Sequence, residues 1–160
     1  MRGTYFLKNS YPKANIPVVQ ISLHSSLNPA LHAALGRALQ PLRSRNVFLL
    51  CSGQTTHPMA TRSGGLKSAQ FEDWLETVLY QGPSDTRVER ALAGFTDANV
   101  LPLIRFAHNP RTEHFTPLLV ALAAGSGSKA RELFGHSRKN GTHWNVLGGA
   151  FSLASFVFDQ

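Results

Sequence analysis

The chain has 160 residues, 42% of them apolar, and a formal net charge of +7. This length suits one domain with a substantial core, and the apolar content is too high for an intrinsically disordered chain. No apolar run approaches the roughly 18 residues that a membrane-spanning helix needs, and the start of the chain lacks the apolar centre of a signal peptide. We therefore expect a single domain over residues 1–160, located in the cytoplasm and without a membrane partner.

The distribution of charge and the cysteine content exclude further classes of protein. The basic residues are scattered, and the densest group, Leu42–Asn46, follows a predicted helix, where cations interact favourably with the helix dipole. No basic stripe with interleaved aromatic residues is present, so nucleic acid is not an expected partner. Cys51 is the single cysteine and lies in an apolar run, which indicates a buried, unreactive thiol rather than a nucleophile.

The first part of the chain predicts a strand, a helix and a second strand. Ile16–Leu23 is short, β-branched and apolar, and the run at 46–53, "NVFLLCSG", has the same character. Between them, Asn28 is a good N-cap and Pro29 suits a first helical turn. Leucines then recur every three or four residues, at Leu31, Leu35, Leu39 and Leu42. This order predicts a right-handed βαβ unit with parallel strands.

The rest of the chain predicts a loop, three helices and a strand-rich end. A Gly/Ser/Thr-rich stretch at 53–68 reads as a long loop, of the kind that is usually functional or disordered. Helices are predicted at Ala69–Tyr80, at 86–95, and from the Thr116-Pro117 pair to a point near Gly125, followed by a loop over 125–144. The alternation in 145–159 predicts one or two strands. The fold class is therefore α/β, with a mixed, partly parallel sheet flanked by helices in three layers.

Histidine is the residue type that most suggests chemistry here, because it binds metals and titrates near neutral pH. The chain has seven: His24, His32, His57, His108, His114, His136 and His143. His57 follows the second predicted strand, and in open α/β sheets ligands bind beyond the strand carboxyl ends. His108 and His114 lie six positions apart across a proline, so they could converge on one site or point apart. His32 is expected to be structural within its helix, and the remaining three are expected on solvated loops.

Five stretches occur in an order that resembles the class III extradiol ring-cleavage dioxygenases, in particular their 4,5-DOPA dioxygenase-like branch. They are "GTYFLKNSYPKANIPVVQISL", "HAALGRALQPLRSRNVFLLCSGQTTHPM", "FEDWL", "AHNPRTEHFTPLLVALAAG" and "FSLASFVFD". The resemblance covers nearly the whole chain and concerns the C-terminal portion of that catalytic domain.

The resemblance implies a non-haem metal, Fe(II) or Zn(II), that binds a catechol-type aromatic substrate together with O2. It implies that His57, in the Ser-Gly-x-x-Thr-His turn, is the acid/base residue and that His114 is a metal ligand. It places His108 near the substrate or behind the ligands.

The chain also departs from the family pattern. The family has an earlier region with two further metal-binding histidines, and where it usually reads Asp-His-Gly-Thr this chain reads Met1-Arg2-Gly3-Thr4. We therefore expect that the N-terminal part of the family fold is lacking, that the metal is weakly held or absent in this chain, and that a homo-oligomer forms over the open surface. The alternative is an inactive remnant that acts as a binding or assembly partner. A hydrolase is disfavoured because no Gly-x-Ser-x-Gly turn is present.

Overall fold

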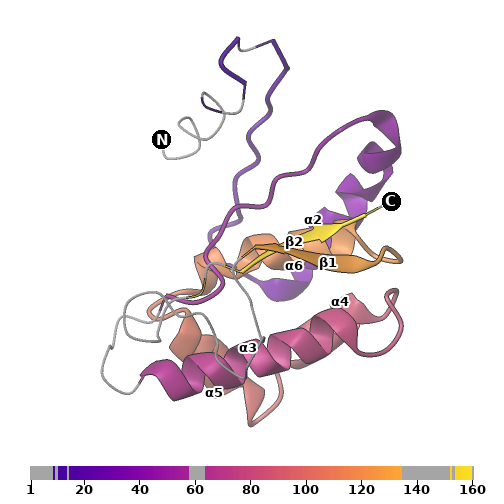
Figure 1. Cartoon of the computed structure of the whole chain (residues 1–160). Coiled ribbons are helices and arrows are strands. Elements are labelled where there is room, and N and C mark those ends of the chain that lie inside the picture. Colours follow the sequence, from indigo (N-terminus) through magenta and orange to yellow (C-terminus); the bar gives the residue numbers. More distant parts are fainter. Residues whose placement is uncertain are drawn as a thin grey trace.

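The structure is a computed structural model that describes residues 9, 11–13, 15–57, 64–134, 152 and 154–159 (Figure 1). It contains five α-helices, two short 3₁₀ helices and two strands within those residues. In chain order these are α2 (Pro29–Leu39), η1 (Gln40–Arg45), α3 (Gly64–Tyr80), α4 (Arg87–Ala93), α5 (Val100–Ala107), η2 (Thr112–His114), α6 (Thr116–Ala124), β1 (Ala130–Phe134) and β2 (Ser155–Phe158). No helix in this part of the chain is both long and apolar enough to cross a bilayer.

Helix α2 begins as the sequence predicts, but it buries a different face. The Asn28 side chain accepts a hydrogen bond from the Leu31 amide at 3.0 Å, and Pro29 is the first helical residue. The buried face consists of His32, Ala33 and Gly36, whereas Leu31 is 45% exposed. The reason is the close packing of α2 on α6, where a Cβ atom on Gly36 would collide with the Val120 carbonyl oxygen. Small residues are therefore needed at the crossing, and the leucines lie beside it.

The core lies where α3, α4, α5 and α6 meet. Helix α6 is buried on nearly all sides, as expected for a helix that is apolar all round. Helix α3 packs on α5, and α4 packs on both α3 and α6. The largest side chains that are fully buried in this core are Phe71, Leu75, Leu79, Ile104, Phe115, Leu119 and Leu122.

The predicted three-layer arrangement with a partly parallel sheet is not what the described residues form. Their sheet has two antiparallel strands, β1 and β2, with Ala130 opposite Phe158 and Arg131 opposite Val157. The two segments predicted as parallel strands, Ile16–Leu23 and 46–53, are extended but are not assigned to any strand. A strand requires a hydrogen-bonded neighbour, and Pro17 cannot donate to one. The fold is a mixed α/β arrangement with a larger helical share than predicted.

Other boundaries also differ from the sequence predictions. Helix α3 begins at Gly64, inside the stretch predicted as a loop, and β1 lies inside the loop predicted over 125–144. Helix α5 was not predicted. Helix α6 has the predicted extent, although its N-cap is Phe115 and makes no side-chain cap. The predicted loop positions of His136 and His143 lie outside the described residues.

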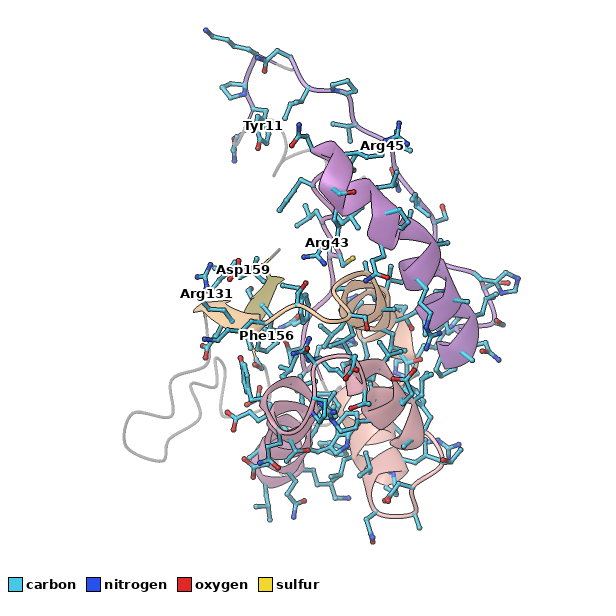
Figure 2. The ribbon with its side chains drawn as sticks, turned by 90° about the vertical axis from the view of Figure 1, so that its right-hand side faces the viewer. Tyr11, Arg43, Arg45, Arg131, Phe156 and Asp159 are labelled. Carbon is cyan, nitrogen blue, oxygen red and sulfur yellow. The ribbon has the colours of Figure 1, made fainter. Side chains whose placement is uncertain are left out.

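The C-terminal strand is attached to the helices by an arginine. Arg43, in η1, donates to the carbonyl oxygens of Phe158 at 2.7 Å and Asp159 at 3.1 Å, and to Ala124 at 3.2 Å at the end of α6. At the outer edge of the sheet, Arg131 and Asp159 form an exposed ion pair at 3.2 Å (Figure 2). The contacts of Arg43 fix β2 relative to the α2–α6 pair.

Candidate metal and catalytic site

His57 lies at the end of an extended segment. Its position is fixed by a hydrogen bond of its own amide and by contacts of the two residues before it. The His57 amide donates to the Ala107 carbonyl at 2.9 Å, at the end of α5. The preceding residue, Thr56, forms an antiparallel bridge with Ser152, and the Thr55 hydroxyl donates to the Ala154 carbonyl at 2.9 Å. The segment is therefore fastened on one side to a helix and on the other to the C-terminal region.

Glu113 and His114 lie on η2, a single tight turn that connects α5 to α6. The turn is closed by the Phe115 amide and the Thr116 hydroxyl, which donate to the Thr112 carbonyl at 3.0 and 2.8 Å. Gly53 packs directly against this turn, and a Cβ atom there would collide with the His114 carbonyl. The absence of a side chain at Gly53 thus allows the segment that carries His57 to approach the turn that carries His114.

The side chains of His57, Glu113 and His114 converge. The ring centroids of the two histidines are 4.2 Å apart with an interplanar angle of 57°. One ligand atom from each of the three residues lies within 4.8 Å of the others. Buried polar atoms normally have hydrogen-bond partners. Here His57 Nε2, Glu113 Oε2 and His114 Nδ1 are all buried and have none within the described part of the chain.

The surroundings of His57 favour its neutral form. Burial lowers the pKa of His57, the nearby His114 lowers it further, and Glu113 acts in the opposite direction. A neutral imidazole has a free lone pair, so it can accept a proton or bind a metal ion. The net lowering of the pKa therefore leaves His57 available for either role near neutral pH.

His108 lies beneath His57 in an aromatic environment and is only 1% exposed. Its ring stacks on Phe115 at 5.1 Å, meets the edge of Phe71 at 5.1 Å, and lies 5.7 Å from the His57 ring. Burial is the main cause that lowers the pKa of His108 to about 3, with smaller effects from His57 and His114. Both ring nitrogens lack a partner among the described residues. His108 is therefore a neutral side chain that packs against the ring of His57.

The structure brings together the three histidines that the sequence singled out, whereas His32 has contacts of its own elsewhere. His57 contacts both His108 and His114, which resolves the open question of whether the latter two converge. His32 is buried in α2, where its Nδ1 lies 2.7 Å from the Asn28 carbonyl oxygen and its Nε2 accepts from the His24 amide. This is the structural role expected for His32.

Glu113 is the member of the cluster to which sequence reasoning gave no role. Its position beside His114 was the available signal, since adjacent residues on a tight turn can reach a common point. Two imidazoles and one carboxylate suit Zn²⁺, and the same set is typical of non-haem Fe(II) sites. The cluster of His57, Glu113 and His114 thus offers the types of donor that a divalent metal ion binds.

Comparison with known proteins gives a consistent result. Residues 5–147 match the family described as the catalytic LigB subunit of aromatic ring-opening dioxygenase. The chain is 40% identical over 154 residues to the 4,5-DOPA dioxygenase extradiol of Beta vulgaris, covering 92% of this chain and 51% of that protein. It is 32% identical over 126 residues to the 4,5-DOPA dioxygenase extradiol of Escherichia coli K12, covering 74% and 44%.

A solved structure shows the same relationship in three dimensions. The crystal structure of an uncharacterized protein from Escherichia coli K12 superposes with a TM-score of 0.68 at 26% identity. That match covers 94% of this chain and 58% of the other. The chain therefore spans about half the length of the curated relatives that it matches.

Proposed function

Because this chain belongs to the family of catalytic LigB subunits of aromatic ring-opening dioxygenases, we propose that it carries part of the centre of an extradiol ring-cleavage dioxygenase. The substrate would be a catechol-type aromatic compound, and O2 the second substrate. The single observation that carries the proposal is the convergence of His57, Glu113 and His114, each of which has a buried polar atom without a hydrogen-bond partner among the described residues.

We assign Glu113 and His114 to the metal. Both lie on η2, so their relative position is set by one short turn. A bound Fe(II) or Zn(II) would supply Lewis acidity towards the hydroxyls of the aromatic diol, and Fe(II) would in addition supply the redox chemistry that O2 requires. Two protein ligands are fewer than the three of a typical catalytic zinc site, so we expect weak binding by the chain alone.

We assign His57 to proton transfer. Its segment is separate from the turn that holds the ligands, and one of its ring nitrogens lies within 4.8 Å of a donor atom of each of them. The lowered pKa keeps the imidazole neutral, so it can take a proton from a substrate hydroxyl placed there. The ring of His108 packs edge-to-face on the ring of His57, and we regard His108 as a positioning residue.

Metal titration of four single variants tests these roles without relying on turnover. We expect Glu113→Gln and His114→Ala to weaken Zn²⁺ binding, measured by isothermal titration calorimetry, about tenfold or more. His57→Ala should leave the affinity nearly unchanged, and His24→Ala is the matched control, because it removes an exposed histidine outside the cluster.

Two outcomes would overturn the assignment. Equal weakening by His57→Ala and His114→Ala would make His57 a third ligand instead of the acid/base group. Unchanged affinity in both Glu113→Gln and His114→Ala would remove the metal centre from this cluster altogether. Where catechol-dependent oxygen uptake is measurable, His57→Ala should lower turnover by roughly 10²–10⁴-fold.

A further inference from the structure

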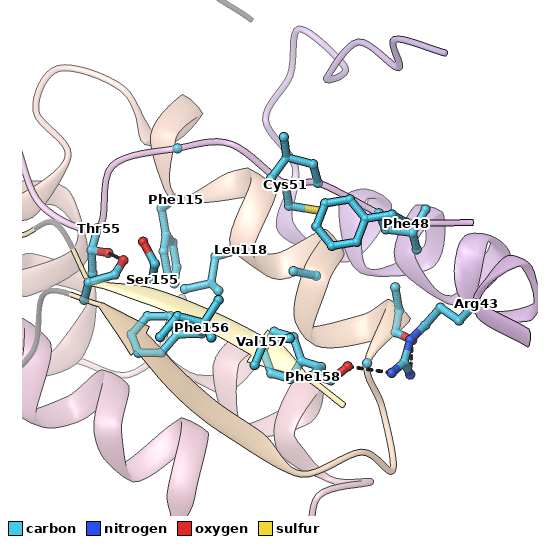
Figure 3. A pocket seen from close by; sticks show the side chains of 18 of the residues that line it. Arg43, Phe48, Cys51, Thr55, Phe115, Leu118, Ser155, Phe156, Val157 and Phe158 are labelled. Carbon is cyan, nitrogen blue, oxygen red and sulfur yellow. Dashed lines mark hydrogen bonds between the residues drawn. The ribbon is translucent and has the colours of Figure 1, made fainter. Parts of the chain in front are cut away.

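Two pockets among the described residues differ in character. One, of about 400 Å³, lies beside β2; its walls are largely apolar, and it reaches His114 (Figure 3). The other, of about 780 Å³, lies between residues 26–29 at the start of α2, helix α5, and the loop at 109–112 that leads into η2. We call it the α5 pocket. None of the residues of the metal and catalytic cluster lines it.

The α5 pocket is positively charged. Arg105, in the last turn of α5, and Arg111, just before η2, both line it, whereas no described aspartate or glutamate does. Neither arginine takes part in the ion pairs that the described residues form. A third cation, Lys67, lies with its Nζ 5.2 Å from the centroid of the Phe106 ring, which also lines the pocket. This concentration of unpaired positive charge attracts an anion.

Arg111 is held in place and still has free donors. One of its terminal amino groups donates to the Ser25 carbonyl oxygen at 3.1 Å, which restrains the guanidinium beside the pocket. A guanidinium has five N–H groups in a planar fork, and a carboxylate can bind such a fork through both of its oxygens. Arg105 has a second role, because a cation at the end of α5 interacts favourably with the helix dipole. Arg111 is therefore the better candidate for direct contact with an anion.

The other walls of the α5 pocket suit the body of an aromatic ligand. The apolar side chains that line it on and next to α5 are Phe95, Leu101, Ile104 and Phe106. His108 lines the same pocket, is 1% exposed, and has two ring nitrogens without a partner among the described residues. Buried polar atoms normally have partners. A ligand with a polar group beside this ring would satisfy a side chain that otherwise has none.

We propose that the α5 pocket binds a small aromatic carboxylate. The carboxylate pairs with Arg111, Arg105 adds to the attraction, and the aromatic ring lies against the apolar walls. This site is separate from the metal and catalytic cluster but next to it, because the His108 ring packs on the His57 ring at 5.7 Å. The proposal does not depend on the metal roles assigned above.

Titration of the 160-residue chain with benzoate, followed by amide NMR shifts, tests the site. EDTA is present, so that benzoate cannot bind through a metal ion. Benzamide is the matched ligand, because it has nearly the same shape and no charge. We expect saturable shifts with benzoate at amides within 26–29 and 104–111, and binding of benzamide that is weaker about tenfold or more.

Three variants that each remove one positive charge identify the residues involved. Arg111→Gln should weaken benzoate binding about tenfold, because hydrogen bonds between two charged groups are lost. Arg105→Gln should weaken it less. Arg131→Gln is the matched control, since Arg131 is exposed on β1 and does not line the pocket, and its benzoate affinity should be unchanged. All three arginines are exposed, so the variants should keep the fold.

Four results would overturn the proposal. These are the absence of any saturable shift, equal binding of benzoate and benzamide, unchanged benzoate affinity in Arg111→Gln, and shifts confined to 53–57 and 113–114. Zinc titration of the cluster is a separate measurement on other residues, so failure of the carboxylate site and failure of the metal assignment are distinguishable.

Discussion

His57 and His114 stand with ring centroids 4.2 Å apart although they come from segments that the chain separates by the whole of α3, α4 and α5. Two contacts bring them together: the His57 amide bonds to the end of α5, and Gly53 packs on the His114 carbonyl. The distance between the two rings therefore depends on how these segments pack. Substitutions that alter the packing should change this distance even where they do not contact either ring.

Gly53→Ala should weaken Zn²⁺ binding by about tenfold, as loss of a supporting contact around a metal site commonly does. The added methyl group would collide with the His114 carbonyl, so the segment has to move away from η2. Calorimetric titration measures the effect, and Ser52→Ala, one exposed residue earlier, is the control. An unchanged affinity in Gly53→Ala would show that the close approach is not needed.

His108→Phe should make the metal-free chain less sensitive to acid. The pKa of His108 is lowered to about 3 from an ordinary 6.5. Between these two pH values, His108 is protonated in the unfolded chain and neutral in the folded chain. Stability from this residue is present above pH 6.5 and is lost as the pH falls from there towards 3, at about 1.4 kcal/mol per pH unit. Phenylalanine keeps the stacking on Phe115 and does not titrate.

Urea denaturation between pH 4.5 and 7.5 measures this difference. The stability of His108→Phe relative to the unaltered chain should rise as the pH falls. Parallel pH profiles for His108→Phe and the unaltered chain would contradict the assignment of a buried, neutral imidazole at position 108.

Gly36→Ala should destabilise the fold by about 1–3 kcal/mol, the usual cost of overpacking. The direction of the change in stability is informative, because alanine in place of glycine normally stabilises a helix by about 0.5–1 kcal/mol. Here the added Cβ meets the Val120 carbonyl oxygen and the Ala123 side chain across the α2–α6 crossing. Thermal or urea denaturation measures this loss of stability. The control is Ala34→Gly, which shows how much helix propensity alone contributes at an exposed position of the same helix. A more stable Gly36→Ala variant would mean that the two helices are less closely packed.

Arg87→Met should cost about 2–4 kcal/mol of stability, since it leaves buried carbonyl groups without a donor. Arg87 is 4% exposed, donates to the carbonyls of Leu79 and Ser128 at 3.1 and 3.0 Å, and lies over the Phe158 ring. The control is Arg131→Met, which removes an exposed ion pair and should cost less than about 1 kcal/mol. Equal effects of the two substitutions, measured by urea denaturation, would contradict a structural role for Arg87.

The local signals in the sequence predicted the helices better than the sheet. The Asn28 cap and Pro29 located the start of α2, and Pro117 with Gly125 located α6, because caps act within a few residues. The two predicted strands have the right composition, but a strand exists only when a distant segment pairs with it, and composition does not identify that segment. Helix α5 was missed because Pro102 interrupts its apolar run.

The residues of the cluster were predicted only in part, and their arrangement was not predicted. The family resemblance pointed to His57 and His114, whereas Glu113 received no role. Their convergence depends on Gly53, which in sequence reads only as part of a turn. Burial of His108 follows from Phe71 and Phe115, which lie on α3 and beside η2, and no spacing rule connects those positions.

The pairing of Thr56 with Ser152 makes assembly of the site a late event during synthesis. Translation has to continue from position 56 to position 152 before the residue next to His57 meets its backbone partner, whereas the helices from α2 to α6 all precede residue 125 in the chain. Domains form as the chain emerges, at about 5–20 residues per second. The segment that carries His57 therefore gains its backbone partner only after all of the helices have been synthesised, so the support of the cluster is completed last.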